Sequence, residues 1–227
     1  MNKEKALSVL SRDVVMELGL DKVDVITSDM IEEYTIICTN AFWRCSSLTS
    51  IDLPNSIISI GNCAFDGCYS ITSIIIPNSV KTIKYYAFSD CFALTSIIIP
   101  NSITRIEKYA FRKCKNLKNV VIGDKAYKNH KIIKNKCKAY KAFNANMTCR
   151  KFQYEEGKTY EIEDNTKLCE HGFHACLNLL DVFNYYNGIF GKDIVVHEVE
   201  LEGVSEERRT NDSKVVAKKI TIGKRIL

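Results

Sequence analysis

A period of 23 residues runs through the middle of this chain, and it restricts the fold more than any other feature of the sequence. Cys45, Cys68, Cys91 and Cys114 follow one another at that spacing. An Ala-Phe pair stands just before each of these cysteines, and Leu or Ile stands three residues after each one. Such a period is typical of stacked repeats, because one unit cannot bury its apolar face alone and neighbouring copies complete the core.

Each copy has the same internal order. After the cysteine, apolar residues lead to a Pro-Asn-Ser turn at residues 54–56, 77–79 and 100–102, which the fourth copy replaces with Gly123-Asp124-Lys125. After the turn, Ile or Val recurs at a spacing of three. The pattern predicts, in each copy, a short helical turn from Ala-Phe to the cysteine, a strand that ends at the proline, and a second extended segment.

These Ala-Phe, Cys, Leu and Ile-Pro-Asn-Ser positions resemble the BspA-like class of leucine-rich repeat over residues 41–124. The resemblance implies a short right-handed solenoid that is used for binding. Upstream, apolar residues recur at helical spacing at Leu7, Leu10, Val14, Val15 and Leu18. We therefore expect an N-terminal helical cap and partial repeat at 1–36, and leucine-rich repeats at 37–124.

The chain has ten cysteines, of which four occupy one repeated position. Free cysteine is among the residue types that are most often buried, and a small side chain suits the interior of a solenoid. We therefore interpret the four stacked cysteines as core positions, in preference to a disulfide framework, a metal site or a redox site.

The predicted strands also expose one column of side chains. Residues 51 and 53 and their equivalents point inward, so the pleat sends residue 52 and its equivalents outward. That column contains Asp52, Ile75, Ile98 and Val121, and the polar column beside it contains Ser50, Ser73, Ser96 and Asn119. The apolar stripe is a candidate protein-binding surface. Two alternatives are that the C-terminal domain covers it, and that β-propensity alone selected these residues.

The net charge of +5 is distributed unevenly. Residues 112–151 contain 13 Lys or Arg against a single acid, Asp124, so this segment carries +12 and the remaining residues sum to −7. Tyrosines interleave with these lysines, which is compatible with nucleic-acid contact, with an acidic protein surface, or with solubility alone. The candidate binding lysines are Lys118, Lys125, Lys128, Lys131, Lys134, Lys136 and Lys138.

Beyond the repeats, we expect a basic junction and a small α+β domain at 125–227. Predicted strands cover 136–143, 150–154, 158–163, 193–201 and 213–222, and residues 177–186 have helical spacing that ends at Asn187-Gly188. The segments 147–161, 169–176 and 180–186 are similar to an uncharacterised domain of bacterial and phage proteins. That similarity covers about residues 136–222 and implies no activity.

The segment 169–176 contains four side chains that bind zinc in other proteins, namely Cys169, His171, His174 and Cys176. Their spacing is tighter than that of a usual zinc knuckle. We therefore favour a structural interpretation, in which Phe173, Ala175 and Cys176 enter the core, and we expect no metal.

The order of elements in this domain also resembles small ADP-ribosyltransferase-like folds, which bind NAD. The resemblance implies His174, Tyr185, Tyr186 and either Glu198 or Glu200 as candidate catalytic residues. The chain departs from that pattern because its first strand has no Arg or His. It also lacks a phosphate-binding loop, a dinucleotide-binding glycine motif and a nucleophile elbow.

The sequence therefore favours a non-enzymatic protein-recognition module that needs no cofactor. The expected partner is another protein, with an acidic surface or with bound nucleic acid, and not a membrane or a small molecule. No apolar run reaches the roughly 20 residues of a membrane span, and no secretion signal is recognised, so we expect a cytoplasmic protein. A phage- or prophage-encoded inhibitor of a host factor, such as a nucleic-acid-handling defence protein, is one form of this function. The alternative is an NAD-using enzyme or a degenerate NAD-binding domain in the C-terminal part.

Overall fold

The computed structural model describes residues 8–128, 136–149, 152–161, 173–185, 188–189, 194–206 and 214–227. The chain divides into two compact units, Met1–Tyr127 and Lys128–Leu227. The first unit is a solenoid built from short parallel strands, and the second is built around an antiparallel sheet.

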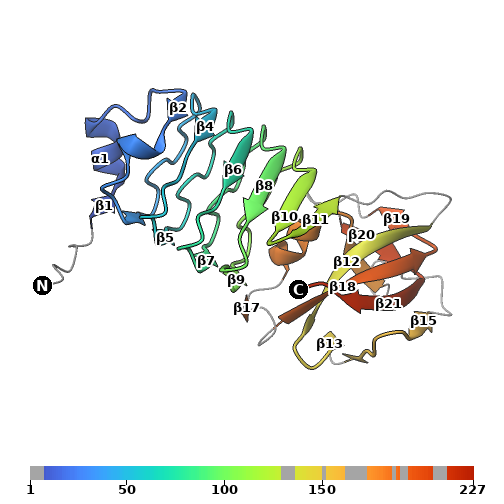
Figure 1. The fold of residues 1–227 in the computed structure, drawn as a ribbon. Helices are drawn as coiled ribbons and strands as arrows, with labels where there is room; N and C mark the ends of the chain where they lie inside the picture. Colours follow the sequence, from blue (N-terminus) through green and yellow to red (C-terminus); the bar gives the residue numbers. More distant parts are fainter. Residues whose placement is uncertain are drawn as a thin grey trace, which may run out of the picture. The chain divides into compact units, whose positions relative to one another are not determined.

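Two ladders of short parallel strands run along the solenoid, as Figure 1 shows. We call the first the strand face; it consists of β6 (Ser73–Ile75), β8 (Ser96–Ile99) and β10 (Asn119–Ile122), with β11 (Lys125–Lys128) beside β10. Nearer the N-terminus, β2 (Val25–Ile26) pairs with β4 (Ser50–Ile51). The second ladder consists of β1 (Val9–Leu10), β3 (Ile36–Ile37), β5 (Ser59–Ile60), β7 (Thr82–Ile83) and β9 (Arg105–Ile106).

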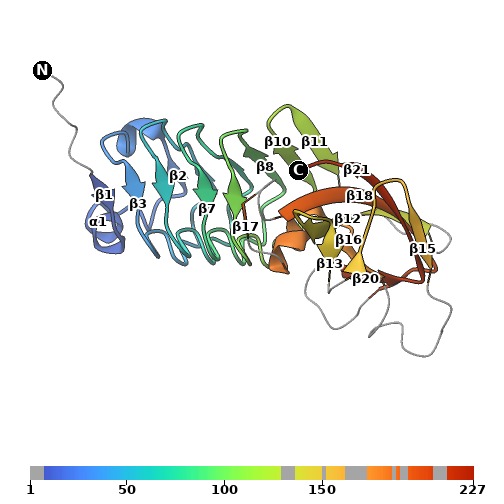
Figure 2. The same ribbon diagram turned by 90° about the horizontal axis from the view of Figure 1, so that it is seen from below.

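Strand pairing joins residues that are equivalent in the repeat. Ile74 pairs with Ile97, which pairs with Val120, and on the second ladder Ile60 pairs with Ile83. Each turn of the solenoid is therefore one 23-residue unit, and Figure 2 shows the turns side by side from below. The predicted solenoid of leucine-rich repeats is confirmed.

A column of phenylalanine rings fills the core between the two ladders. Phe42, Phe65, Phe88 and Phe111 stack nearly parallel, with successive ring centroids 5.1, 5.3 and 5.5 Å apart. All four rings are buried, as are the alanine before each one and the Leu or Ile three residues after each cysteine. Because every copy contributes the same side chains, the core continues from turn to turn, and its stability comes from contacts between neighbours.

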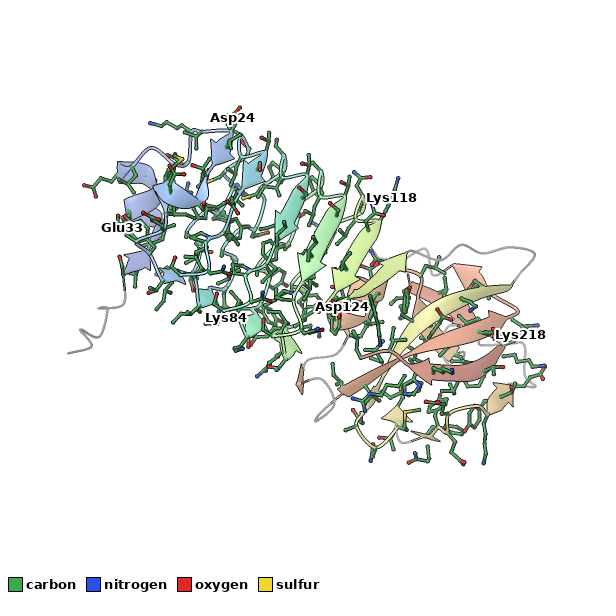
Figure 3. All side chains as sticks on the ribbon, viewed as in Figure 1. Asp24, Glu33, Lys84, Lys118, Asp124 and Lys218 are labelled. Atoms are coloured by element: carbon green, nitrogen blue, oxygen red, sulfur yellow. The ribbon has the colours of Figure 1, made fainter. Side chains whose placement is uncertain are left out.

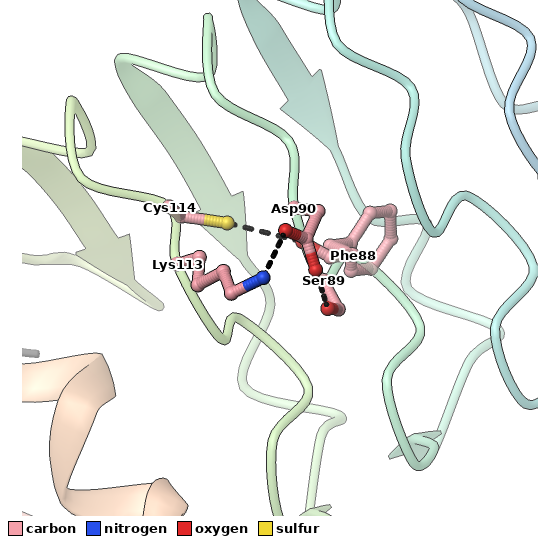
Figure 4. Close-up of polar contacts among 5 residues, drawn as sticks. All are labelled: Phe88, Ser89, Asp90, Lys113 and Cys114. Atoms are coloured by element: carbon pink, nitrogen blue, oxygen red, sulfur yellow. Dashed lines mark hydrogen bonds and ion pairs between the residues drawn. The ribbon is translucent and has the colours of Figure 1, made fainter. Parts of the chain in front are cut away.

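The stacked cysteines are hydrogen-bond donors in this core. The thiols of Cys68, Cys91 and Cys114 donate to the carbonyls of Phe42, Phe65 and Phe88 at 3.0, 3.2 and 3.0 Å. Figure 4 shows the last of these contacts. Cys45 lies in the first complete copy, and its sulfur instead accepts from the Arg12 guanidinium at 3.2 Å. The prediction that the four cysteines are core positions is confirmed, because all four are buried and free.

The segment between Ala-Phe and cysteine is a run of tight turns and not a helical turn. Alternate amides bond in different directions: the Trp43 amide donates to the Asn40 carbonyl within the turn, whereas the Phe42 amide donates to the Ala64 carbonyl of the next copy. Two residues of each run have positive φ, and they form the columns Asn40, Cys63, Tyr86, Tyr109 and Arg44, Gly67, Asp90, Lys113. A helix cannot form here because about half of the amides donate to carbonyls of the next copy and not to carbonyls within their own turn.

The N-terminal helix is shorter than predicted. It spans Arg12–Glu17 (α1) and begins where the Ser11 side chain accepts a hydrogen bond from the Val14 amide. Leu10 does not belong to it, because β1 pairs in parallel with β3, where Leu10 is opposite Ile37. A short 3-10 helix, η1 (Ser28–Met30), follows β2.

The second unit contains an antiparallel sheet in the strand order β15-β21-β18-β12-β16-β20-β19. The longest strands, β12 (Lys136–Asn144) and β18 (Ile194–Glu202), pair along their whole length. The others are β15 (Thr159–Glu161), β16 (Phe173–Cys176), β19 (Ser205–Glu206), β20 (Lys214–Ala217) and β21 (Lys219–Arg225). Outside this sheet lie the hairpin of β13 (Thr148–Cys149) and β14 (Phe152–Gln153), and β17 (Gly188–Ile189).

Two predictions for this unit need correction. The helix expected at 177–186 is a 3-10 helix, η2 (Leu179–Asn184), which begins where the Asn178 side chain accepts from the Leu180 amide. The strand expected at 213–222 is two strands, β20 and β21, interrupted at Lys218, whose amide donates to the Glu202 carbonyl at 3.2 Å. One face of the sheet carries a core that includes Ala139, Phe143, Val199 and Ile222.

Candidate functional site

The predicted apolar stripe lies on the strand face, with its members in register. Ile75 is opposite Ile98, and Ile98 is opposite Val121. Ile75 is 60 % exposed and Ile98 is 42 % exposed, whereas Val121 is half-buried. Neighbouring strands lie about 4.8 Å apart, so the three side chains form one continuous apolar surface.

The pleat of the strands accounts for this exposure. Ile74, Ile97 and Val120, each one residue earlier, are almost fully buried, and so are Ile76 and Ile99 on the other side of Ile75 and Ile98. The fold needs apolar residues at these inward positions only. At the equivalent outward position of the first copy the chain has Asp52, which is exposed, so the outward isoleucines are not required by the repeat.

A second apolar column on the turns before these strands was not predicted. Tyr69 and Phe92 stack with ring centroids 5.3 Å apart and planes 8° apart. They are 40 % and 41 % exposed. They follow Cys68 and Cys91 directly, and the equivalent residues of the other copies are Ser46 and Lys115. A comparison of this position across the repeats could have identified the pair. Because serine and lysine occupy it in other copies, the fold does not require an aromatic ring there.

The basic residues nearest to the stripe in the chain lie at the C-terminal end of the solenoid. Lys115 and Lys118 are exposed just before β10, and Lys125 is exposed at the start of β11. Figure 3 labels Lys118 at the beginning of β10. Three exposed lysines therefore lie at the C-terminal end of the solenoid, after the apolar stripe and the Tyr69–Phe92 pair of the earlier turns.

The remaining candidate lysines belong to the second unit or lie outside the described residues. Lys138, in β12, forms an ion pair with Glu198 at 2.9 Å, and this contact raises the pKa of Lys138. Lys128 and Lys136 are in β11 and β12, but their side chains are not described. Lys131 and Lys134 lie outside the described ranges.

The turns of the solenoid also carry a polar cluster, shown in Figure 4. Asp90 accepts hydrogen bonds from the Ser89 hydroxyl at 2.8 Å and from the Lys113 ammonium at 2.9 Å. The nearby Asp66 carboxyl is partly buried, and this burial raises its pKa, although hydrogen bonds from Ser89 and Trp43 oppose the shift. These contacts join successive turns and are structural.

The candidate catalytic residues lie on three elements of the second unit. His174 is in β16, Glu198 and Glu200 are in β18, and Tyr185 follows η2, where the Lys214 ammonium lies 5.0 Å from the centre of its ring. Tyr186 lies outside the described residues. Because β12 lies between β16 and β18 and the register sets His174 level with Val196, the backbone of His174 is about 12 Å from that of Glu198 and about 16 Å from that of Glu200. The NAD-using alternative stays a prediction, which calorimetry with NAD would test.

The candidate zinc ligands are only partly described. Cys169 and His171 lie outside the described residues, whereas His174 and Cys176 are both in β16. Phe173, Ala175 and Cys176 are buried, as the structural interpretation predicts. In the ranges that the structure covers, no three His, Cys, Asp or Glu residues gather in a way that could hold a metal ion. None of the described helices is long and apolar enough to cross a bilayer.

Two family comparisons give matches. The description "BspA type leucine rich repeat region", in 6 copies, matches residues 35–179. A domain of unknown function, DUF7666, matches residues 137–227. The repeat match thus extends past Ile122, where the parallel strands of the solenoid end and the second unit follows. No curated protein matches the chain.

Solved structures of bacterial leucine-rich repeat proteins are similar to part of the chain. A T. pallidum leucine-rich repeat protein is 24 % identical with a TM-score of 0.38, over 46 % of this chain and 71 % of that one. A leucine-rich cell surface protein of Faecalibacterium prausnitzii is 20 % identical with a TM-score of 0.25, over 46 % of this chain and 42 % of that one. A Bacteroides ovatus leucine-rich repeat protein is 25 % identical with a TM-score of 0.26, over 47 % of this chain and 39 % of that one.

Proposed function

Because the chain belongs to the family of BspA-type leucine-rich repeat proteins, we propose that its solenoid recognises another protein. Stacked repeats present the same position of every copy along one continuous face, which suits contact with a large partner. The strand face, with its stripe of Ile75, Ile98 and Val121, is the surface that we assign to this contact.

The observation that carries the proposal is the exposure of apolar residues that the repeat does not require. Ile75 and Ile98 project from adjoining strands, and the stacked rings of Tyr69 and Phe92 lie on the turns that lead into those strands. The first copy has Asp52 and Ser46 in these two columns. Aromatic and branched apolar side chains contribute strongly to protein interfaces when a partner removes them from water.

The charge at the end of the strand face supports a partner with an acidic surface. Lys115, Lys118 and Lys125 are exposed on the last turn, and among the described residues no carboxylate forms an ion pair with them. Acidic groups on a partner would speed its association and fix its orientation on the stripe. The further proposal of a phage-encoded inhibitor of a host factor rests only on the similarity of residues 136–222 to a domain of bacterial and phage proteins.

Substitution of the stripe tests this function. The double variant Ile75→Ser, Ile98→Ser is expected to keep the fold, because both side chains project into solvent. A matched control is Ile58→Ser, which removes an isoleucine that is 48 % exposed just before β5 on the second ladder. We expect a specific protein captured from source cells by the full chain to be depleted about tenfold or more with the stripe variant only. Equal recovery of all captured proteins with the wild-type chain, the stripe variant and the Ile58→Ser control would refute the assignment.

A further inference from the structure

Three tyrosine rings gather on the second ladder, where the chain leaves β7 and β9. Tyr85 and Tyr86 have ring centroids 4.9 Å apart, and Tyr109 of the next copy lies 5.7 Å from Tyr85 and 5.2 Å from Tyr86. All three side chains are partly exposed. They therefore form one aromatic surface that spans two turns of the solenoid.

Two cations lie near the Tyr109 ring, and two more come shortly before Tyr85 in the chain. The Lys108 ammonium lies 4.8 Å from the centre of the Tyr109 ring, and the Arg112 guanidinium lies 5.8 Å from it. Lys84 directly precedes Tyr85, and Lys81 is exposed just before β7. Within the part of the chain that the structure describes, no carboxylate forms an ion pair with any of these four cations.

The acidic side chains of the same two turns, Glu107 and Asp90, already have partners within the solenoid. Glu107 accepts a hydrogen bond from the Tyr85 amide at 3.1 Å and lies 3.7 Å from the Arg105 guanidinium. Asp90 binds Lys113 at 2.9 Å. The surface therefore keeps a clear excess of positive charge beside the rings.

The repeat itself does not require this surface. The column of Tyr85 and Lys108 contains Thr39 and Asn62 in the earlier copies, and the column of Tyr86 and Tyr109 contains Asn40 and Cys63. The earlier copies pack equally well with these small residues, because Phe42, Phe65, Phe88 and Phe111 are all buried. Moreover, Tyr86 and Tyr109 have positive φ, which is unfavourable for a bulky side chain and well tolerated by asparagine. Packing does not account for tyrosine at these positions.

We propose that this surface, formed by Tyr85, Tyr86, Tyr109, Lys81, Lys84, Lys108 and Arg112, binds single-stranded nucleic acid. Aromatic rings stack on unpaired bases, and neighbouring cations neutralise the phosphates between them. An acidic protein would need the cations alone, whereas a strand of nucleotides uses rings and cations together. The site is separate from the strand face: Figure 3 labels Lys84 on the β7 side and Lys118 at the start of β10 on the other side.

The experiment measures binding of the full chain to a fluorescent oligothymidylate by anisotropy, with polyglutamate as the competing acidic probe. Neutralisation of four phosphates predicts that affinity falls with salt with a logarithmic slope of about −3. The oligonucleotide is expected to bind and to resist displacement by polyglutamate. Absence of binding by the wild-type chain would overturn the proposal, and so would equal competition by polyglutamate.

The decisive variant is Tyr86→Asn, Tyr109→Asn, which gives both positions the residue that the first copy has at Asn40 with φ of 60°. We expect it to keep its thermal stability and to bind the oligonucleotide at least about tenfold more weakly. The matched control is Tyr69→Ser, Phe92→Ser, which removes two aromatic rings from the turns that lead into the strand face and copies Ser46 of the first repeat. Unchanged affinity of the tyrosine variant would assign any binding to the lysines of residues 112–151 and sink the proposal.

Discussion

The stacked cysteines contribute to the fold as protonated thiols. Burial raises the pKa of Cys45 and of Cys68, and the neighbouring Cys114 thiol together with burial raises that of Cys91. Only the thiolate attacks electrophiles or binds soft metals. A thiol that donates to a phenylalanine carbonyl is therefore both hydrogen-bonded and unreactive, which suits a column of free cysteines inside one protein.

Alkylation tests this account of the thiols. With iodoacetamide at mildly alkaline pH, we expect Cys68, Cys91 and Cys114 to stay unmodified in the folded chain, whereas the partly exposed Cys38 and Cys149 react. For Cys68 and Cys91 the sign follows from the raised pKa, because a thiol with a raised pKa becomes a thiolate only at higher pH. Cys114 is protected by its burial. Mass spectrometry of peptides gives the extent at each site, and denaturant should make all of them react. Early modification of Cys91 in the folded chain would contradict the account.

Among the elements, the turn between β10 and β11 has a specific requirement for glycine. Gly123 has φ of +57°, its amide donates to the Ile99 carbonyl at 2.8 Å, and a Cβ added there would overlap the Asn101 side chain. The fourth copy thus needs glycine where the earlier copies have proline. The turn ends the repeats because the chain reverses there into β11 and does not continue to another extended segment.

The substitution Gly123→Ala measures this requirement. Positive φ alone costs an alanine about 1–2 kcal/mol, and the overlap with Asn101 adds to that cost. Gly19→Ala is the matched control, because Gly19 has φ of +68° with nothing within 4 Å of an added Cβ. Urea unfolding is expected to show a clearly larger loss of stability for Gly123→Ala than for Gly19→Ala. Equal losses would mean that Asn101 moves aside without cost.

The periodic elements could be predicted from the sequence, and the others only in part. Ile75 and Ile98 could be assigned to an exposed column because the pleat and the 23-residue period fix their direction together. Tyr69 and Tyr86 lie on turns, where direction depends on φ and on bonds to the next copy. The pattern predicts one strand at 213–222 where the structure has two, β20 and β21, because the break at Lys218 depends on its hydrogen bond to Glu202, which is distant in sequence. Lys141 belongs to the basic segment 112–151, yet it is buried and donates to the His174 carbonyl at 2.8 Å.

The whole molecule consists of two compact units, Met1–Tyr127 and Lys128–Leu227. In the first, the phenylalanine column is continuous through four copies. In the second, one core cluster lies on one face of the antiparallel sheet, and buried side chains such as Val196 and Val216 lie on the other face. A chain of two compact units need not unfold in one step. The first unit is held by contacts between neighbours at short sequence separation, whereas the sheet pairs strands as distant as β12 and β18.

Unfolding in urea is therefore expected to show two transitions. The single tryptophan, Trp43, reports on the first unit through its fluorescence, because Arg44 lies over its ring at 4.6 Å. Cys137, buried in the core of the second unit, reports on that unit through pulsed alkylation. We expect the two probes to give different midpoints. Coincident midpoints would show instead that the units unfold together.

The bonds between copies have a consequence for how such a protein can change its length. They join equivalent atoms: the Phe65 amide donates to the Ala87 carbonyl as the Phe42 amide does to the Ala64 carbonyl. A gene segment that encodes 23 residues can therefore be duplicated or lost within the array. At each new junction, neighbouring copies can form the same backbone hydrogen bonds as before. Recombination in whole steps would lengthen or shorten the strand face and the tyrosine surface while the terminal cap and the second unit keep their sequences.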